Sequence, residues 1–306
     1  MAEYTQQQLL DLVNQSQVNP GNDRVRQITE RMVTDLFRAI DDLDIKPDEF
    51  WAGIDWLSRL GANGQIGLIT AGLGFDRLID IREVEADAAA CRAAGTPRAI
   101  EGPLYIPGAP LAQAEVRLDE DPVPGEILIM EGQVRDTNGK PVAGALVDVW
   151  HANEHGRYSH FDPQQTPNHL RRKIETDMQG RYRFRSFIPP GYAIPPNSPT
   201  SELFEALGRH GNRPAHIHFL VTAEGMRTLT TQINIPGDTF LDDDFAFATR
   251  DGLIVALEPN TPAQGYESLG VSAPFTRAHF DFVLQPAIDA DEARPEARME
   301  RIAATV

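Results

Sequence analysis

Ile127-Leu-Ile-Met-Glu-Gly-Gln-Val-Arg135 decides the fold class, because this run of β-favouring residues ends at the turn sequence Asp136-Thr-Asn-Gly139. A second such run spans residues 143–151. Asn and Gly tolerate the positive φ of a tight turn, so the pattern predicts two strands joined as a hairpin. Similar short runs recur downstream between Gly, Pro, Asn and Asp, which is typical of an all-β sandwich or barrel. We expect further strands at residues 181–187, 215–221, 228–235, 252–257 and 278–284.

The N-terminal part of the chain has a helical period instead. Apolar residues recur there at three- and four-residue spacing: Val25, Ile28, Met32, Leu36, Ile40 and Leu43. A second helix is expected to start at Pro47, since proline suits a first turn, and a third to cover part of residues 65–91. We expect the apolar faces to be buried in a core or a protomer interface. The predicted fold is α+β, with a helical segment at residues 1–97 followed by a mostly antiparallel β-sandwich domain at residues 98–306.

The charge balance and the single cysteine narrow the class of protein. The chain has 28 Lys and Arg against 45 Asp and Glu, a formal net charge of -17, which disfavours nucleic acid and anionic membranes as partners. Cys91 is the one cysteine, and it cannot form an internal disulfide. The first residues resemble no secretory signal, and no apolar run is long enough for a membrane span. We therefore expect a soluble cytoplasmic protein.

The sharpest local motif is Arg213-Pro-Ala-His216-Ile-His218, in which two imidazoles stand two residues apart in a β-like run. The period of a strand places both on one face. This spacing presents two neutral nitrogens to one transition metal, but a pair of hydrogen-bonded strand histidines explains it equally well. The motif alone leaves both interpretations open.

Two tyrosines upstream change that balance. Tyr158 follows a glycine in the run after the 143–151 strand, and Tyr192 lies in the proline-bearing segment 188–197, which cannot be a central strand. Taken singly, a tyrosine is usually a packing residue whose hydroxyl finds a partner. The joint occurrence of two displayed phenols and the histidine pair indicates a metal site.

The surrounding motifs resemble those of the intradiol ring-cleavage dioxygenases, in particular the branch that acts on catechol. The resemblance runs nearly end to end, and its most specific stretches are Ile100-Glu-Gly-Pro-Leu-Tyr105, Val149-Trp-His-Ala-Asn153, Gly156-Arg-Tyr158-Ser-His-Phe-Asp162, Leu207-Gly-Arg-His-Gly-Asn-Arg-Pro-Ala-His216-Ile-His218, Leu229-Thr-Thr-Gln232-Ile-Asn234 and Asp243-Asp-Phe-Ala-Phe-Ala-Thr-Arg-Asp-Gly252.

The resemblance implies one Fe(III) per chain, bound by Tyr158, Tyr192, His216 and His218. Phenolates are hard ligands that suit ferric iron, and the chain has no thiolate pair. The implied reaction is cleavage of catechol by O2, between the two hydroxyl-bearing carbons, to cis,cis-muconate in the degradation of aromatic compounds. Tyr192 would release the iron and help accept a substrate proton, Arg213 would face the bound ring, and Gln232 would lie close to the iron. Without the resemblance, we would interpret Arg213 as a surface residue and Gln232 as an ordinary strand residue.

The resemblance also implies a substrate pocket and a partner. The implied pocket residues, each equally credible as plain core, are Leu68, Ala71, Ile100, Pro103, Leu104, Phe245 and Ala246. The N-terminal helices would form a homodimer and enclose phospholipid, although the same apolar stripes suit a tight helix–helix interface. Hydroxyquinol and chlorocatechol are alternative substrates for the same chemistry. A different class stays open, because residues 132–145 also look like a non-catalytic transthyretin-like binding sandwich.

Overall fold

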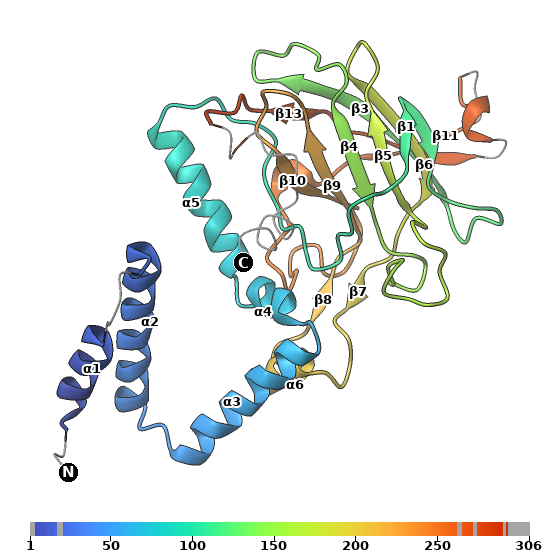
Figure 1. Ribbon diagram of the computed structural model, residues 1–306. Coiled ribbons are helices and arrows are strands. Elements are labelled where there is room, and N and C mark those ends of the chain that lie inside the picture. Colours follow the sequence, from blue (N-terminus) through green and yellow to red (C-terminus); the bar gives the residue numbers. More distant parts are fainter. Residues whose placement is uncertain (1–3, 17–20, 262–264, 272–273, 290–291, 293–306) are drawn as a thin grey trace. The chain divides into compact units, whose positions relative to one another are not determined.

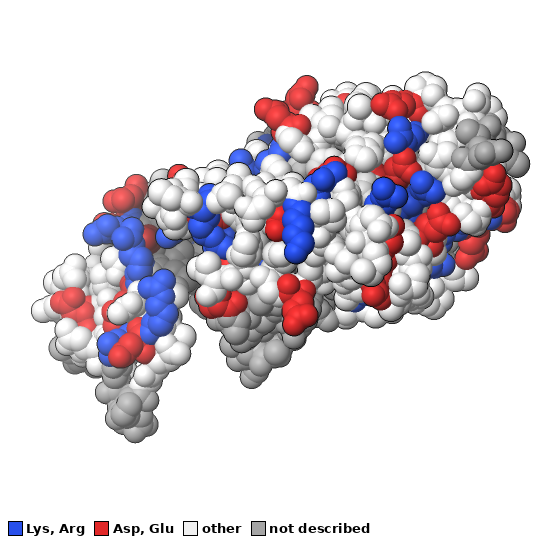
Figure 2. Space-filling view, turned by 90° about the horizontal axis from the view of Figure 1, so that it is seen from above, with Lys and Arg blue, Asp and Glu red and all other residues white. Residues whose placement is uncertain are grey.

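The computed structural model describes residues 4–16, 21–261, 265–271, 274–289 and 292. The chain divides into two compact units, residues 1–63 and 64–306, and each is described by itself. The first unit is helical and the second carries all the sheets (Figure 1). Of the described helices, none is long and apolar enough to cross a membrane. Acidic and basic side chains lie interspersed over the larger unit on the face drawn in Figure 2, unlike the basic stripe of a nucleic-acid-binding domain.

The first unit consists of α1 (Gln6–Gln15), α2 (Asp23–Asp42) and α3 (Pro47–Ala62). The predicted helices around residues 25–43 and from Pro47 are confirmed, whereas α1 was not predicted. Asn22 caps α2 by accepting hydrogen bonds from the backbone of residues 24 and 25. Within the single chain the apolar stripe is not buried in a core, since Ile28 is 45% and Leu36 is 59% exposed. Its burial in a protomer interface stays a prediction. These helices leave most of the stripe uncovered.

The larger unit begins with α4 (Ile66–Gly72) and α5 (Phe75–Ala89), and a third helix, α6 (Pro199–Ala206), follows later. One helix was expected in this region. Instead the chain breaks at Gly74, whose φ of +80° is a left-handed conformation that ends a helical run. Gln65 accepts hydrogen bonds from the backbone and hydroxyl of Thr200, which anchors the start of α4 to the start of α6.

Two sheets form the body of the larger unit. The five-stranded sheet has the order β1-β5-β4-β9-β10, and the six-stranded sheet has the order β11-β12-β3-β6-β2, with β13 also on β3. Most pairings are antiparallel, and β1–β5, β2–β6, β12–β3 and β13–β3 are parallel. The predicted α+β class is therefore confirmed. The strands are β1 (Leu111–Gln113), β2 (Glu115–Arg117), β3 (Ile127–Asp136), β4 (Leu146–Trp150), β5 (Arg171–Glu175), β6 (Arg181–Phe187), β7 (Tyr192–Ala193), β8 (Asn212–Arg213), β9 (His216–Thr222), β10 (Leu229–Asn234), β11 (Leu257–Asn260), β12 (Phe275–His279) and β13 (Phe282–Leu284).

The predicted hairpin is only partly present. The turn forms as expected, with the Gly139 amide donating to the carbonyl of Asp136. The flanking strands do not pair, because β3 belongs to the six-stranded sheet and β4 to the five-stranded sheet. Only an isolated bridge joins Arg135 to Pro141, whose ring nitrogen has no hydrogen to continue a ladder. The chain then crosses from one sheet to the other.

Two other strand predictions need correction. Residues 252–257 do not form a strand, since a short 3-10 helix occupies Asp251–Leu253 and β11 begins only at residue 257. Residues 278–284 are divided between β12 and β13. The remaining predicted strands correspond to β3, β4, β6, β9 and β10 within a few residues.

The main hydrophobic core contains residues from β3, β6, β4 and β9, including Leu128, Phe184, Val147 and Phe219. On β9 the alternation is strict. Ile217, Phe219 and Val221 belong to this core, so period two turns the histidines of the same strand to its other face. That second face is the base of the candidate site.

Candidate active site and metal centre

Four side chains from three segments converge on one point. The hydroxyl oxygen of Tyr158 lies 3.3 Å from that of Tyr192, which is 3.4 Å from Nε2 of His216. Nε2 of His216 is in turn 3.1 Å from Nε2 of His218. Tyr158 comes from the loop after β4, Tyr192 from the short strand β7, and the histidines from β9. The structure thus brings together all four residues that the sequence marked as metal ligands.

Both histidines are in their neutral form, which a metal ligand requires. Burial, helped by the neighbouring Arg213, lowers the pKa of His216 to about 3. Burial and the adjacent His216 hold the pKa of His218 well below its usual range. Nδ1 of His216 lies 2.6 Å from the carbonyl oxygen of Pro214, to which it donates, so its Nε2 carries a lone pair directed into the site.

The donor set fits a cation. The two neutral imidazoles point nitrogens at each other across 3.1 Å, and two phenol oxygens border the same space. Burial and the neighbouring Tyr192 raise the pKa of Tyr158 well above its usual range, so a phenolate there needs a strong positive charge beside it. Among the described residues no three His, Cys, Asp or Glu side chains form a possible metal cluster, so a metal held by His216 and His218 needs donors of another type, which the two tyrosines offer.

Neighbouring residues position the four donors. The Trp150 indole stacks on the ring of His218, with centroids 5.0 Å apart and planes 5° apart. Gly156 has a φ of +72°, and a Cβ there would lie 2.6 Å from the Cβ of Tyr192. Only glycine allows this approach of the two loops. Trp150 pairs with His218 across β4 and β9, a register that sequence reasoning did not reveal.

Arg213 and Gln232 lie beside the donors. Arg213 Nη1 is 2.9 Å from Nε2 of His216, and its Nη2 donates to the Gln232 amide oxygen at 2.6 Å. The guanidinium also donates twice to the buried carboxylate of Asp244 at 3.2 Å. Burial opposes the charge of Arg213, but Asp244 outweighs it and raises the pKa of Arg213 above its usual range.

Asp244 is a functional candidate that sequence reasoning missed. Its carboxylate accepts the backbone amides of residues 246 and 248 as well as the Arg213 guanidinium. Burial alone would raise its pKa, yet Arg213 holds the pKa of Asp244 below its usual value. The sequence offered one sign of this role: Asp244 is an acidic residue next to Phe245, in a segment whose other buried side chains are apolar.

The expected pocket residues fall into two groups, one near the donors and one near Asp244. Leu104 packs against the buried cluster that contains Tyr158 and Trp150. A Cβ on Gly102 would lie 3.7 Å from the ring of His218, so the segment of Ile100, Pro103 and Leu104 passes close to the imidazole. In the other group Leu68 is half-buried and Ala71 is buried on α4, and the buried Phe245 and Ala246 adjoin Asp244. None of the expected pocket residues lines the concavity that borders Tyr192.

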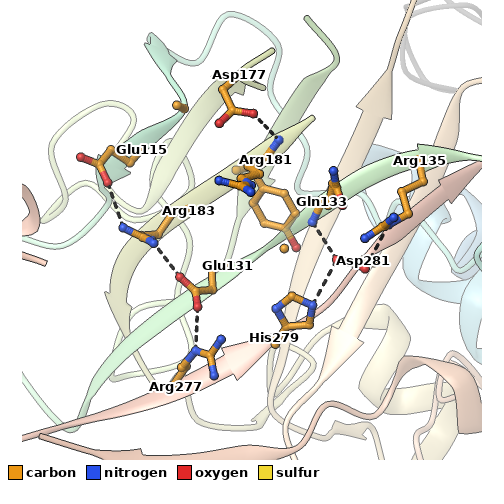
Figure 3. A pocket seen from close by; sticks show the side chains of 13 residues that line it. Glu115, Glu131, Gln133, Arg135, Asp177, Arg181, Arg183, Arg277, His279 and Asp281 are labelled. Carbon is orange, nitrogen blue, oxygen red and sulfur yellow. Dashed lines mark hydrogen bonds and ion pairs between the residues drawn. The ribbon is translucent and has the colours of Figure 1, made fainter. Parts of the chain in front are cut away.

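Concavities on the surface of the larger unit include two of several hundred Å³. One, of about 520 Å³, is lined by Tyr192 and by the residues Gly191, Ala193, Asn212, Gly237, Asp238, Thr239 and Phe240. The other, of about 400 Å³, lies over β3, β6 and β12 (Figure 3) and contains none of the expected site residues. Its charges pair internally, since Glu131 accepts from both Arg183 and Arg277. Of these two concavities, only the first borders one of the four donors, Tyr192.

The chain is similar to known dioxygenases over most of its length. The family described as "Dioxygenase" matches residues 100–286, and "Catechol dioxygenase N terminus" matches residues 22–91. Catechol 1,2-dioxygenase 2 of Acinetobacter lwoffii is 55% identical over 249 residues, 81% of this chain and 90% of that protein. The crystal structure of catechol 1,2-dioxygenase from Pseudomonas arvilla C-1 is 49% identical, with a TM-score of 0.88 over 95% of this chain and 94% of that one.

Relatives with other substrates are more distant. A chlorocatechol 1,2-dioxygenase of Pseudomonas putida is 33% identical over 76% of this chain and 86% of that protein. A hydroxyquinol 1,2-dioxygenase of Rhizobium is 32% identical over 85% of this chain and 89% of that protein. The dioxygenase match includes residues 132–145, so the alternative of a transthyretin-like binding sandwich has no support left. The chain belongs to the intradiol ring-cleavage dioxygenases, a family of non-haem iron enzymes.

Proposed function

We propose that this protein cleaves catechol with O2 between the two hydroxyl-bearing carbons, giving cis,cis-muconate, at one Fe(III) per chain held by Tyr158, Tyr192, His216 and His218. The observation that carries the proposal is the convergence of two phenol oxygens and two neutral imidazole nitrogens within 3.1–3.4 Å of one another. Phenolates are hard, electron-donating ligands that favour the ferric state. When bound, ferric iron would supply Lewis acidity that activates the catecholate toward O2.

Tyr192 is the ligand best placed to leave and take up a substrate proton. It is half-buried on a strand of two residues and borders the 520 Å³ concavity, whereas Tyr158 is 3% exposed within a packed cluster. A phenolate that leaves a cation regains its basicity and can accept a proton from a catechol hydroxyl. Three buried donors and one half-buried donor on a short strand suit a site in which Tyr192 leaves and the others stay bound.

Arg213 would stabilise negative charge on the bound ring. Its guanidinium is buried, stays protonated, and donates to Nε2 of His216 at 2.9 Å. That lone pair cannot accept from Arg213 and bind a cation together, so metal binding would free Nη1 to face the substrate. Gln232, which accepts from Arg213 and donates to Asn234, would hold the guanidinium in place.

Catechol is favoured over its chlorinated and hydroxylated analogues. The residues expected at the pocket, Leu68, Ala71, Ile100, Pro103, Leu104, Phe245 and Ala246, are apolar and offer no side-chain hydrogen-bond partner for a third hydroxyl. Relatives named for catechol are also much more similar than those named for chlorocatechol or hydroxyquinol. Initial rates of oxygen uptake on the three substrates test this preference directly.

The iron assignment predicts a visible phenolate-to-iron charge-transfer band that shifts when catechol is added without O2. Tyr158→Phe should lose iron or most of this band. Tyr182→Phe is the matched control, because Tyr182 is an equally buried tyrosine whose hydroxyl bonds to the Phe280 carbonyl in the six-stranded sheet. Equal effects of the two substitutions, or a colourless protein that cannot be loaded with iron, would refute the site.

We propose further that residues 1–97 form a helical dimerisation domain and residues 98–306 the catalytic domain of a cytoplasmic homodimer. The support is the exposed stripe on α2, which includes Ile28, Met32 and Leu36. A phospholipid in this interface is an additional proposal, testable by solvent extraction and mass spectrometry. Ile28→Glu with Leu36→Glu should give monomers in light scattering, whereas Arg38→Glu on α2 should not; an unchanged mass would contradict this interface.

A further inference from the structure

Arg171 is a buried cation without a carboxylate partner. It is 2% exposed, at the start of β5, and among the described residues no Asp or Glu oxygen lies within 4 Å of its guanidinium. Its partners are neutral: Nε donates to the Ser159 hydroxyl at 2.8 Å, and Nη2 donates to the carbonyls of Leu104 at 2.8 Å and Ser159 at 3.2 Å. Burying a charged side chain that has only neutral hydrogen-bond partners is costly in free energy unless an opposite charge is close.

The available carboxylate nearby is already engaged. Asp148 accepts a hydrogen bond from the Tyr105 hydroxyl at 3.1 Å and lies 3.6 Å from Nζ of Lys173. What the Arg171 guanidinium faces instead is the Tyr158 ring, with its carbon Cζ 5.9 Å from the centroid. A neutral aromatic face attracts a cation weakly, and a phenolate would attract it strongly.

We propose that Arg171 is a positioning residue that holds Tyr158 and supplies the countercharge for its phenolate when iron is bound. The inference rests on the proposed iron site and deepens it. The guanidinium clamps the loop through Ser159, the residue after Tyr158, and fixes the 100–104 segment through the Leu104 carbonyl. One side chain therefore joins a metal ligand to this segment and stabilises the ligand's charge.

The test compares the charge-transfer band and iron retention of Fe(III)-loaded variants. Arg171→Met removes the charge, Arg171→Lys keeps it, and Arg172→Met is the control on the neighbouring residue, whose side chain donates to the backbone carbonyls of residues 168 and 171. Light in this band moves negative charge from the phenolate toward the metal, away from Arg171. Loss of the guanidinium should shift the band to longer wavelength and speed iron release to a chelator roughly tenfold.

Arg171→Lys should keep the band close to wild type even if both substitutions at this position lower thermal stability, because the charge and not the fork geometry sets the band. A band unchanged in Arg171→Met, or shifted equally in Arg171→Lys, overturns the countercharge role. A wild-type protein that binds no iron would instead overturn the proposed function, so the two failures are distinguishable. If Arg171→Met does not fold, Arg171→Gln, which also removes the charge, replaces it and the same criteria apply.

Discussion

Asp148 should make the protein less stable as the pH rises, and Asp148→Asn should remove that effect. The carboxyl is buried on β4, and burial raises its pKa from 3.8 to about 6 despite Lys173 and the Tyr105 hydroxyl. A raised pKa means that the folded state binds the proton more tightly than the unfolded state. The resulting stabilisation is fully present below pH 3.8 and is lost as the pH rises through about 6.

The size of the effect follows from the shift. A difference of about 2 pKa units corresponds to about 3 kcal/mol between the two protonation states. Asparagine mimics the neutral carboxyl and can still accept from Tyr105, and Lys173 is exposed enough to be hydrated when its partner is gone. Between about pH 5 and about pH 7.5 the stability of Asp148→Asn relative to wild type should increase by roughly 1.4 kcal/mol.

Urea denaturation of both proteins at the two pH values measures this difference. Glu154→Gln, which changes an exposed carboxylate in the same unit, controls for general charge effects and should shift the midpoint little at either pH. A difference between Asp148→Asn and wild type that is the same at both pH values would refute the reasoning. So would an Asn variant that becomes relatively less stable as the pH rises.

Two other substitutions have matched controls in the same chain. Gly156→Ala should abolish iron binding, because its Cβ would meet that of Tyr192 at 2.6 Å. Gly139 has a similarly positive φ but open space around it, so Gly139→Ala should cost only about 1–2 kcal/mol and leave the iron content unchanged. Asp244→Asn should lower the free energy of unfolding by about 3–5 kcal/mol, because Arg213 is left buried without its carboxylate, while the exposed neighbour Asp243→Asn should change it little. Iron analysis and chemical denaturation measure these outcomes, and equal behaviour within either pair would count against the argument.

The period of apolar residues located most elements but not their partners. Alternation identified β3, β6 and β9 because each has one face in the core. It could not show that β3 and β4 enter different sheets, since a turn between two apolar runs is the same motif whether the chain pairs back or crosses over. The apolar stripe of α2 likewise predicted a helix, but periodicity does not say what covers it.

The candidate site could be predicted where its chemistry is carried by unusual residue types. Two histidines at strand spacing and two tyrosines in loops can be recognised in the sequence itself, and the structure brings all four together. Asp244, Trp150 and Arg171 did not stand out, because their importance depends on strand register and on which loops meet. Such supporting residues need the tertiary structure.

The strand β9 explains why the two histidines hold their geometry. Its alternate residues Ile217 and Phe219 are fully buried in the main core, so a movement of either histidine would require the core to repack. Tyr192 has no such anchor, since its strand pairs through two residues only. A site in which one ligand exchanges with substrate while the others remain needs both kinds of donor. His216 and His218 on the core strand are the rigid donors, and Tyr192 at the border of a concavity is the looser one.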